Sequence, residues 1–268
     1  LTLAFYLARA ATDAAAQSPT FFVDPTRAVL EEAPPWLPPE WAAEAQAALR
    51  DLHPFSIFDS RGTEDAERAL RGLGWVRSVE RAGRTFPRTA RLRIRVRRPV
   101  ARVDSAGGSA LLDEEGKLLP SPGPEREAFL PPLPRLVATR GDFGVPPGLG
   151  LPWRDRRVRT GVAAAVEVRS LVLRRGPSRV VAIDVTDADG KEGPLASPVV
   201  LLAEGGARIL WGRPAAERAF GELSTAAKLD ALSRVEATYP MLGGVREVDL
   251  RFDRPVVFAD SSRLADAH

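Results

Sequence analysis

Residues 73–103, LGWVRSVERAGRTFPRTARLRIRVRRPVARV, decide how the first part of this chain folds. Over residues 92–97, apolar residues alternate with arginines, and this period of two predicts a strand with one apolar face and one basic face. An antiparallel partner strand precedes it, and residues 84–88 form the turn between the two. Pro99 ends the second strand because proline has no amide hydrogen to donate.

Two helices are predicted before this hairpin. Residues 63–73 have Thr63 as N-cap, acidic residues in the first turn and a glycine at the end. Residues 40–52 carry apolar side chains at helical spacing. A short strand is predicted at 19–23, and the proline-rich residues 24–39 read as an irregular surface insertion. The order is therefore strand, helix, helix, strand, strand, in which helices can cover the apolar face of the sheet.

The chain after residue 103 alternates short apolar runs with turn signals. Residues 110–120 predict a hairpin around Asp113 and Gly116; the acidic turn could instead suggest a metal site, but no further ligand spacing follows. Residues 121–134 read as a proline-rich linker. Further strands are predicted at 136–138, 180–185, 199–203, 207–211, 245–252 and 256–259. Helices are predicted at 153–175, where 168–173 fits either helix or strand, and at 214–239, with a break near 221–225.

Composition excludes several kinds of chemistry. The chain has 268 residues, 44% hydrophobic and 27% charged, which fits one large or two ordinary globular domains. It has no cysteine, so disulfides and thiolate sites are excluded. Its two histidines are His53, expected to cap a helix or lie on the surface, and the terminal His268. A histidine triad or two-histidine metal site is therefore implausible, although a pair of catalytic carboxylates stays possible. We expect no enzyme activity, no cofactor and no metal.

The arginine row at residues 91–98 is the best argument for nucleic-acid binding. The net charge of +3 is small for this length, and no aromatic residues interleave with the arginines to stack on bases. A solvated sheet face is the simpler interpretation. A basic nucleic-acid-binding domain remains a distant alternative.

Residues 1–11, LTLAFYLARAA, are apolar but shorter than the roughly 20 residues that a membrane span needs, and Arg9 interrupts them. They fit either the buried start of a helix or the outer end of a transmembrane helix or signal segment.

Several motifs, taken in order, resemble the FtsQ/DivIB family of cell-division proteins, which have a POTRA domain followed by a β domain. In that family a phenylalanine-led turn precedes a helix, a W-V-x-x-V strand follows, and the next strand ends in a charged residue before P-[VI]-A. A [VL]-D-x-x-G hairpin, a leucine-proline pair and a V-D-L-R-[YF] strand come later. The matching residues here are Phe55, Trp75-Val76, Val79, Pro87, Arg98-Pro99-Val100-Ala101, Leu112-Asp113, Gly116, Leu133-Pro134, Lys228-Leu229, Tyr239-Pro240 and Val248-Asp249-Leu250-Arg251-Phe252.

The resemblance implies an α+β fold of two domains. Residues 1–18 would be a membrane-helix stub and linker, and 19–103 a POTRA-like β-α-α-β-β domain with the proline-rich insertion at 24–39. Residues 104–259 would be a mixed, mostly antiparallel β domain with a C-terminal edge strand, followed by a flexible tail at 260–268.

The resemblance also implies a function without catalysis. The family scaffolds the division machinery from the bacterial inner membrane, with a single membrane span and the bulk of the chain in the periplasm at the septum, and it binds FtsB/FtsL-like partners. A partner strand would pair with the last strand, whose apolar sequence near a chain end also suggests a sheet edge; a central or covered strand is the other possibility. The expected partner-binding residues are Phe252, Arg254, Val256, Val257 and Phe258, with Arg93, Arg95 and Arg97 as a possible basic face of the POTRA part.

A second function fits the same motifs. A POTRA-containing periplasmic chaperone or transport adaptor would use the same strand edges for other clients. Salt dependence separates both interpretations from nucleic-acid binding, which weakens steeply as salt rises.

Overall fold

The computed structural model of the protein describes residues 14, 18–31, 37–56, 60–85, 89–105, 108–121, 130–190 and 197–259. The chain is α+β, and it divides into two compact units. Unit 1 comprises Leu1–Arg97 with Pro122–Phe129, and unit 2 comprises Arg98–Ser121 with Leu130–His268. The division at Arg97 precedes the boundary predicted at residue 103, because strand β5 (Pro99–Ser105) pairs with two strands of unit 2.

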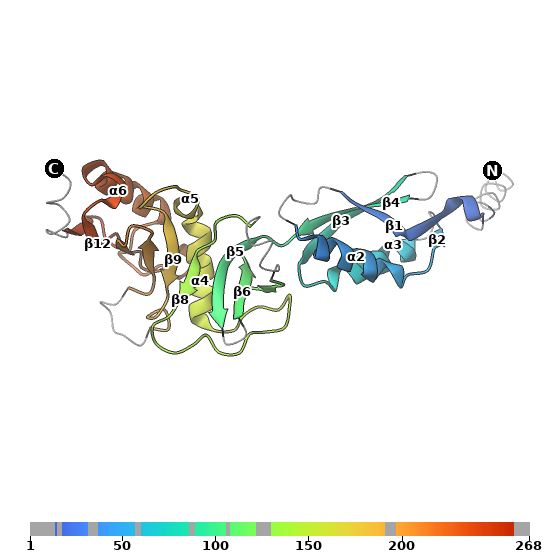
Figure 1. Cartoon of the computed structure of the whole chain (residues 1–268), viewed down its shortest axis with the longest axis horizontal. Coiled ribbons are helices and arrows are strands. Elements are labelled where there is room, and N and C mark those ends of the chain that lie inside the picture. The colour runs from blue at the N-terminus through green and yellow to red at the C-terminus, as the bar shows by residue number, and fades with distance from the viewer. Residues whose placement is uncertain are drawn as a thin grey trace. The chain divides into compact units, whose positions relative to one another are not determined.

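Unit 1 has the predicted order of strand, helix, helix, strand, strand, with one short additional strand. After a 3-10 turn, η1 (Pro19–Phe21), its elements are β1 (Phe22–Glu31), α2 (Pro39–Arg50), β2 (Phe55–Ser56), α3 (Ser60–Arg71), β3 (Val76–Thr85) and β4 (Thr89–Val96). The sheet order is β2-β1-β4-β3; β1 runs parallel to β4, and the other neighbours are antiparallel. Both helices lie side by side along this sheet (Figure 1).

Two stacked tryptophans lie in the core of unit 1. Trp41 of α2 and Trp75, just before β3, have ring centroids 5.4 Å apart. The indole N–H of Trp75 donates a 2.8 Å hydrogen bond to Glu44, so the polar atom of this buried ring is satisfied. Ala45 and Leu49 follow Trp41 on the buried face of α2 at the spacing that predicted the helix.

Several predictions for unit 1 are wrong. The strand predicted at 19–23 begins only at Phe22, after the 3-10 turn η1, and the first two residues of the turn predicted at 84–88 belong to β3. Residues 24–31 are not irregular, because β1 continues through Pro25 to Glu31. The pairing of β1 with β4 shifts register between Asp24 and Val29, and this interruption tolerates a residue that has no amide hydrogen. Helix α3 begins at Ser60, so Thr63 lies inside the helix and is not its N-cap. The end of α3 at Arg71 agrees with the predicted glycine stop.

Unit 2 is built on one large mixed sheet. Its strands are β5 and β6 (Gly108–Asp113), β7 (Leu118–Leu119), β8 (Arg135–Val137), β9 (Val180–Asp184), β10 (Val200–Ala203), β11 (Arg208–Leu210), β12 (Val245–Asp249) and β13 (Val256–Ala259). The order is β13-β12-β11-β10-β9-β8-β5-β6-β7. The pairs β11–β12, β5–β8 and β8–β9 are parallel and the other neighbours are antiparallel, as expected for a mostly antiparallel mixed sheet.

Helix α4 (Arg156–Glu167) packs closely on this sheet because it carries a glycine at the contact. A Cβ atom added to Gly161 would lie 3.0 Å from methyl groups of Leu136 and Val185. Asp155 caps the helix by accepting a hydrogen bond from the Arg157 amide. The helix is followed at once by α5 (Arg169–Val172), so the ambiguous residues 168–173 are mainly helical.

The region 214–239 contains two helical segments with a wider break than predicted. A 3-10 turn, η3 (Ala215–Glu217), is separated from α6 (Thr225–Thr238), whose N-cap is Ser224. A further 3-10 turn, η4 (Pro240–Leu242), leads into β12 and holds Met241 and Leu242 at positive φ.

The hairpin predicted at 110–120 is confirmed. Strands β6 and β7 pair in antiparallel register, and Gly116 has a φ of 71°, in the region that favours glycine. The buried Asp113 carboxylate accepts hydrogen bonds from the amides of Glu115 and Lys117 at 2.9 and 2.8 Å. This carboxylate therefore organises the turn, as an aspartate does in a tight turn.

Candidate strand-docking edge

Strand β13 is the outermost strand at one end of the unit 2 sheet. It pairs with β12 on one side, and in the described chain no strand pairs with its other side. Among the described residues, no strand covers the backbone groups of β13 that point away from β12. Exposed edges of this kind can pair with a strand of a partner protein.

The two faces of β13 differ in burial. Val257 lies opposite Val248 of β12 and packs on the hydrophobic core of unit 2. Val256 and Phe258 lie on the other face, opposite Asp249 and Glu247, and are 50% and 45% exposed. The edge therefore presents apolar side chains beside its backbone groups, and these can contact alternate residues of an added strand.

Phe252 and Arg254 were predicted on the last strand but lie in the turn before it. Strand β12 ends at Asp249 and β13 begins at Val256, so the predicted continuation of β12 to Phe252 is wrong. Both side chains are exposed, and the guanidinium of Arg251 lies 5.3 Å from the centre of the Phe252 ring. Of the five predicted residues, Val256, Val257 and Phe258 are the ones on the edge strand.

An ion pair fixes the turn between β12 and β13. Arg251 contacts both carboxylate oxygens of Asp249, with the shortest separation 2.7 Å, and its amide donates to the same carboxylate. Burial alone would raise the pKa of Asp249, but the side-chain and backbone hydrogen bonds and the charge of Arg251 outweigh it, so the pKa lies below the ordinary value. The Arg251 carbonyl accepts from the Leu223 amide, which joins the turn to the segment before α6.

A buried lysine supports the same end of the sheet. Lys228 of α6 is 1% exposed, donates a 3.0 Å hydrogen bond to the Arg213 carbonyl and lies 5.3 Å from the Trp211 ring centre. Burial lowers its pKa, while the charges of Glu222 and Glu167 raise it by a smaller amount. Glu222 also accepts from the Arg213 amide, so the loop after β11 is tied to the segment before α6 as well as to α6 itself.

The predicted basic row lies in unit 1. Arg93 and Arg95 are on β4 with Ile94 buried between them, which agrees with the period of two. Arg97 follows the strand, and its amide donates to the Trp75 carbonyl at 2.8 Å. Arg93 and Arg95 thus lie at alternate positions of β4, an inner strand of the sheet, and Arg97 follows it at the next alternate position. Their role as a basic binding face stays a prediction.

Within the described ranges, no group of three or more histidine, aspartate or glutamate side chains is arranged to hold a metal ion. His53 is exposed after α2. Among the helices that can be described, none has the length and apolar content needed to cross a bilayer. Residues 1–11, the expected membrane stub, and the tail 260–268 lie outside the described residues.

In comparisons with known proteins, no protein-family model matches this chain and no curated protein matches it. The candidate site therefore rests on the geometry of unit 2 and on the sequence motifs. Sequence reasoning missed the support given by Lys228 and the Asp249–Arg251 pair. The D-x-R spacing of residues 249–251 belongs to a motif noted above, and charges of opposite sign at the end of a strand could have indicated an anchored turn.

Proposed function

We propose that this chain is a non-catalytic scaffold of the FtsQ/DivIB type, which joins cell-division membrane proteins through contacts outside the cytoplasm. The observation that carries the proposal is the position of β13, an apolar strand at the sheet edge with Val256 and Phe258 exposed. An FtsB/FtsL-like partner adds a strand there and gains main-chain hydrogen bonds.

The architecture of unit 1 supports the same proposal. Its β-α-α-β-β order is the order that the resemblance implies for a POTRA domain, and the short β2 is the addition to it. The motif residues fall at structural boundaries: Trp75 precedes β3, Pro99 begins β5, and Asp113 and Gly116 make the β6–β7 turn. In this proposal the protein is anchored in the inner membrane by a single span and acts in the periplasm at the septum.

A binding titration tests the proposal. The protein is titrated with the extracytoplasmic segment of the FtsB-like protein from the same genome, at low and high salt. Binding through main-chain hydrogen bonds and apolar contacts should persist at high salt, whereas binding by screened surface charges should weaken.

Two matched variants locate the contact. Phe258→Lys places a charge on the edge strand and should weaken binding about tenfold or more, since lysine on an edge strand opposes pairing. Phe252→Lys makes the same change at a comparably exposed residue of the preceding turn and should have a smaller effect. Absence of binding by the folded wild type, or equal loss in both variants, argues against strand addition at β13.

A further inference from the structure

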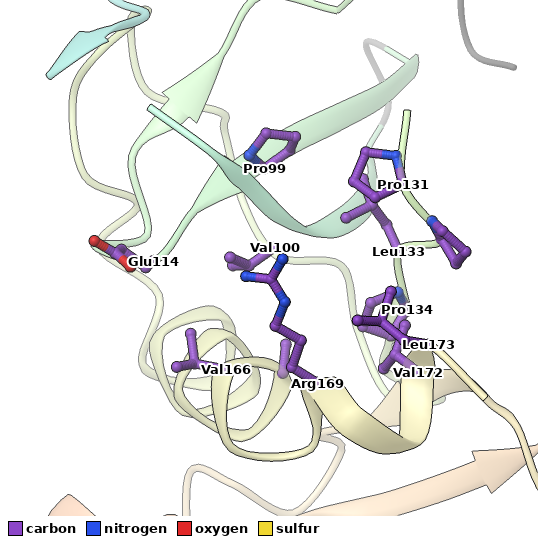
Figure 2. Close-up of a pocket in the computed structure, with 12 residues that line it drawn as sticks. Pro99, Val100, Glu114, Pro131, Leu133, Pro134, Val166, Arg169, Val172 and Leu173 are labelled. Carbon is purple, nitrogen blue, oxygen red and sulfur yellow. The ribbon is translucent and has the colours of Figure 1, made fainter. Parts of the chain in front are cut away.

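Unit 2 has a second surface feature, a shallow apolar groove beside β5. In the order of strands in the sheet, β5 is far from β13. One wall is the proline-rich segment 131–134, another is the α4–α5 junction, and Pro99 and Val100 of β5 form the base. Figure 2 shows Arg169 rising from the helix toward Val100 in the middle of the groove. All of these residues belong to unit 2.

The walls of the groove carry exposed aliphatic side chains. Val166 and Leu173 are 43% and 48% exposed on the helical wall. On the opposite wall, Pro131, Pro132 and Pro134 have no amide hydrogen, and the Pro134 carbonyl already accepts from the Arg102 amide. Strand β5 pairs with β6, whereas its pairing with β8 involves only Arg102 and Val103 and does not reach the groove residues Pro99 and Val100. Because three of the four residues of the proline wall offer no amide hydrogen, we expect side-chain contacts to hold an occupant of the groove.

The size of the groove selects the kind of occupant. Its cavity volume is about 50 Å³. Sites for small organic molecules are commonly about 300–1,000 Å³, so this one suits a single small aliphatic side chain. An extended peptide can place one such side chain in the groove while the rest of it lies along the surface.

Arg169 is the arginine that lines the groove, and Arg98, which precedes Pro99, is exposed and does not line it. Neither guanidinium makes a hydrogen bond or ion pair with the residues that the structure describes, whereas nearby Arg174 is paired with Glu236 at 2.8 Å. Burial, and then the positive charge of Arg169, lower the pKa of Arg98. Within the part of the chain that the structure describes, Arg169 is therefore an unpaired cation beside an apolar surface, and its guanidinium is suited to bind a carboxylate.

We propose that this groove binds an extended segment of a partner protein in which an aliphatic residue is adjacent to an acidic one. The aliphatic side chain enters the cavity beside Val166 and Leu173, and the carboxylate lies at Arg169. Glu114 also lines the groove, and its negative charge repels an acidic peptide residue placed beside it. The peptide should therefore bind in the orientation that keeps its acidic residue away from Glu114. This proposal does not depend on the function proposed for β13.

Selection from a library of random nonapeptides displayed on phage tests the proposal and does not require the partner to be identified first. The library is panned on the whole protein after subtraction on the variant Arg169→Gln, whose thermal midpoint is compared with that of the wild type. We expect enriched peptides to carry Asp or Glu next to Val, Leu or Ile. Absence of any enrichment over the Arg169→Gln variant overturns the proposal.

Titration of one enriched synthetic peptide separates the two contacts. Arg169→Gln and the peptide's own acid-to-amide change should each weaken binding about tenfold, as expected for a charge-assisted hydrogen bond. Leu173→Ser should also weaken it, while Arg175→Gln, which changes an arginine that does not line the groove, should not. If inorganic phosphate displaces the peptide and Leu173→Ser has no effect, the groove is a simple anion site and the peptide proposal is wrong.

Discussion

Single side chains at the C-terminal end of unit 2 fix the turn that leads into the edge strand β13. Asp249 and Arg251 are two residues apart and mostly buried, and they form a two-point contact that a flexible turn would not keep. Since the pKa of Asp249 is lowered on folding, its contribution to stability is complete above the ordinary carboxyl value near 3.8 and is lost as the pH falls through the lower folded-state value.

Replacement of this carboxylate should therefore destabilise the protein in a pH-dependent way. At pH 7, Asp249→Asn should lower the free energy of unfolding by about 1–2 kcal/mol, because Arg251 loses its charged partner. The difference from wild type should shrink as the pH falls below about 3.8, as measured by urea unfolding at a series of pH values. Asp230→Asn is the control: its carboxylate is 81% exposed, so the change should have little effect. An equal loss for Asp249→Asn at pH 7 and at the lowest pH contradicts this assignment.

At the scale of elements, the fit of α4 to its sheet depends on the absence of a side chain at one position. Gly161→Val should cost about 1–3 kcal/mol, because the added methyl groups overlap Leu136 and Val185 in a close-packed core. Ala163→Val, on the same helix but half-buried, mainly tests the lower helix propensity of valine and should cost less. Denaturant midpoints of the two variants compare them; similar losses would show that the contact at Gly161 is not tight.

The elements also show what the sequence could and could not predict. The alternation of Ile94 with its arginines and the spacing of Trp41, Ala45 and Leu49 identified a strand and a helix, because those patterns reflect burial directly. Strand β1 was missed beyond Val23, since Pro25 and its neighbours look like a loop until the shifted pairing with β4 is known. The groove at Arg169 was missed because it is made of segments that are distant in sequence. No local sequence pattern indicates that such segments lie close together in the fold.

At the scale of the whole molecule, the chain consists of two units, each with its own sheet and its own buried residues. A loss of packing in one unit should therefore destabilise mainly that unit. Leu70→Ala removes a side chain that is fully buried in unit 1 and should cost about 2–5 kcal/mol there. Amide hydrogen exchange should become faster in β3 and β4, with β9 and β10 little changed. Equal acceleration in both units would mean that they unfold as one.

The central claim is that β13 is an edge to which a partner adds a strand, and amide hydrogen exchange of the complex tests it most directly. The protein is saturated with the FtsB-like extracytoplasmic segment, and exchange is followed over residues 245–259 and over the strands of unit 1. The account predicts slower exchange for β13, because its outward amides become hydrogen-bonded in the complex. Unchanged exchange in β13, with protection elsewhere in a saturated complex, would contradict it.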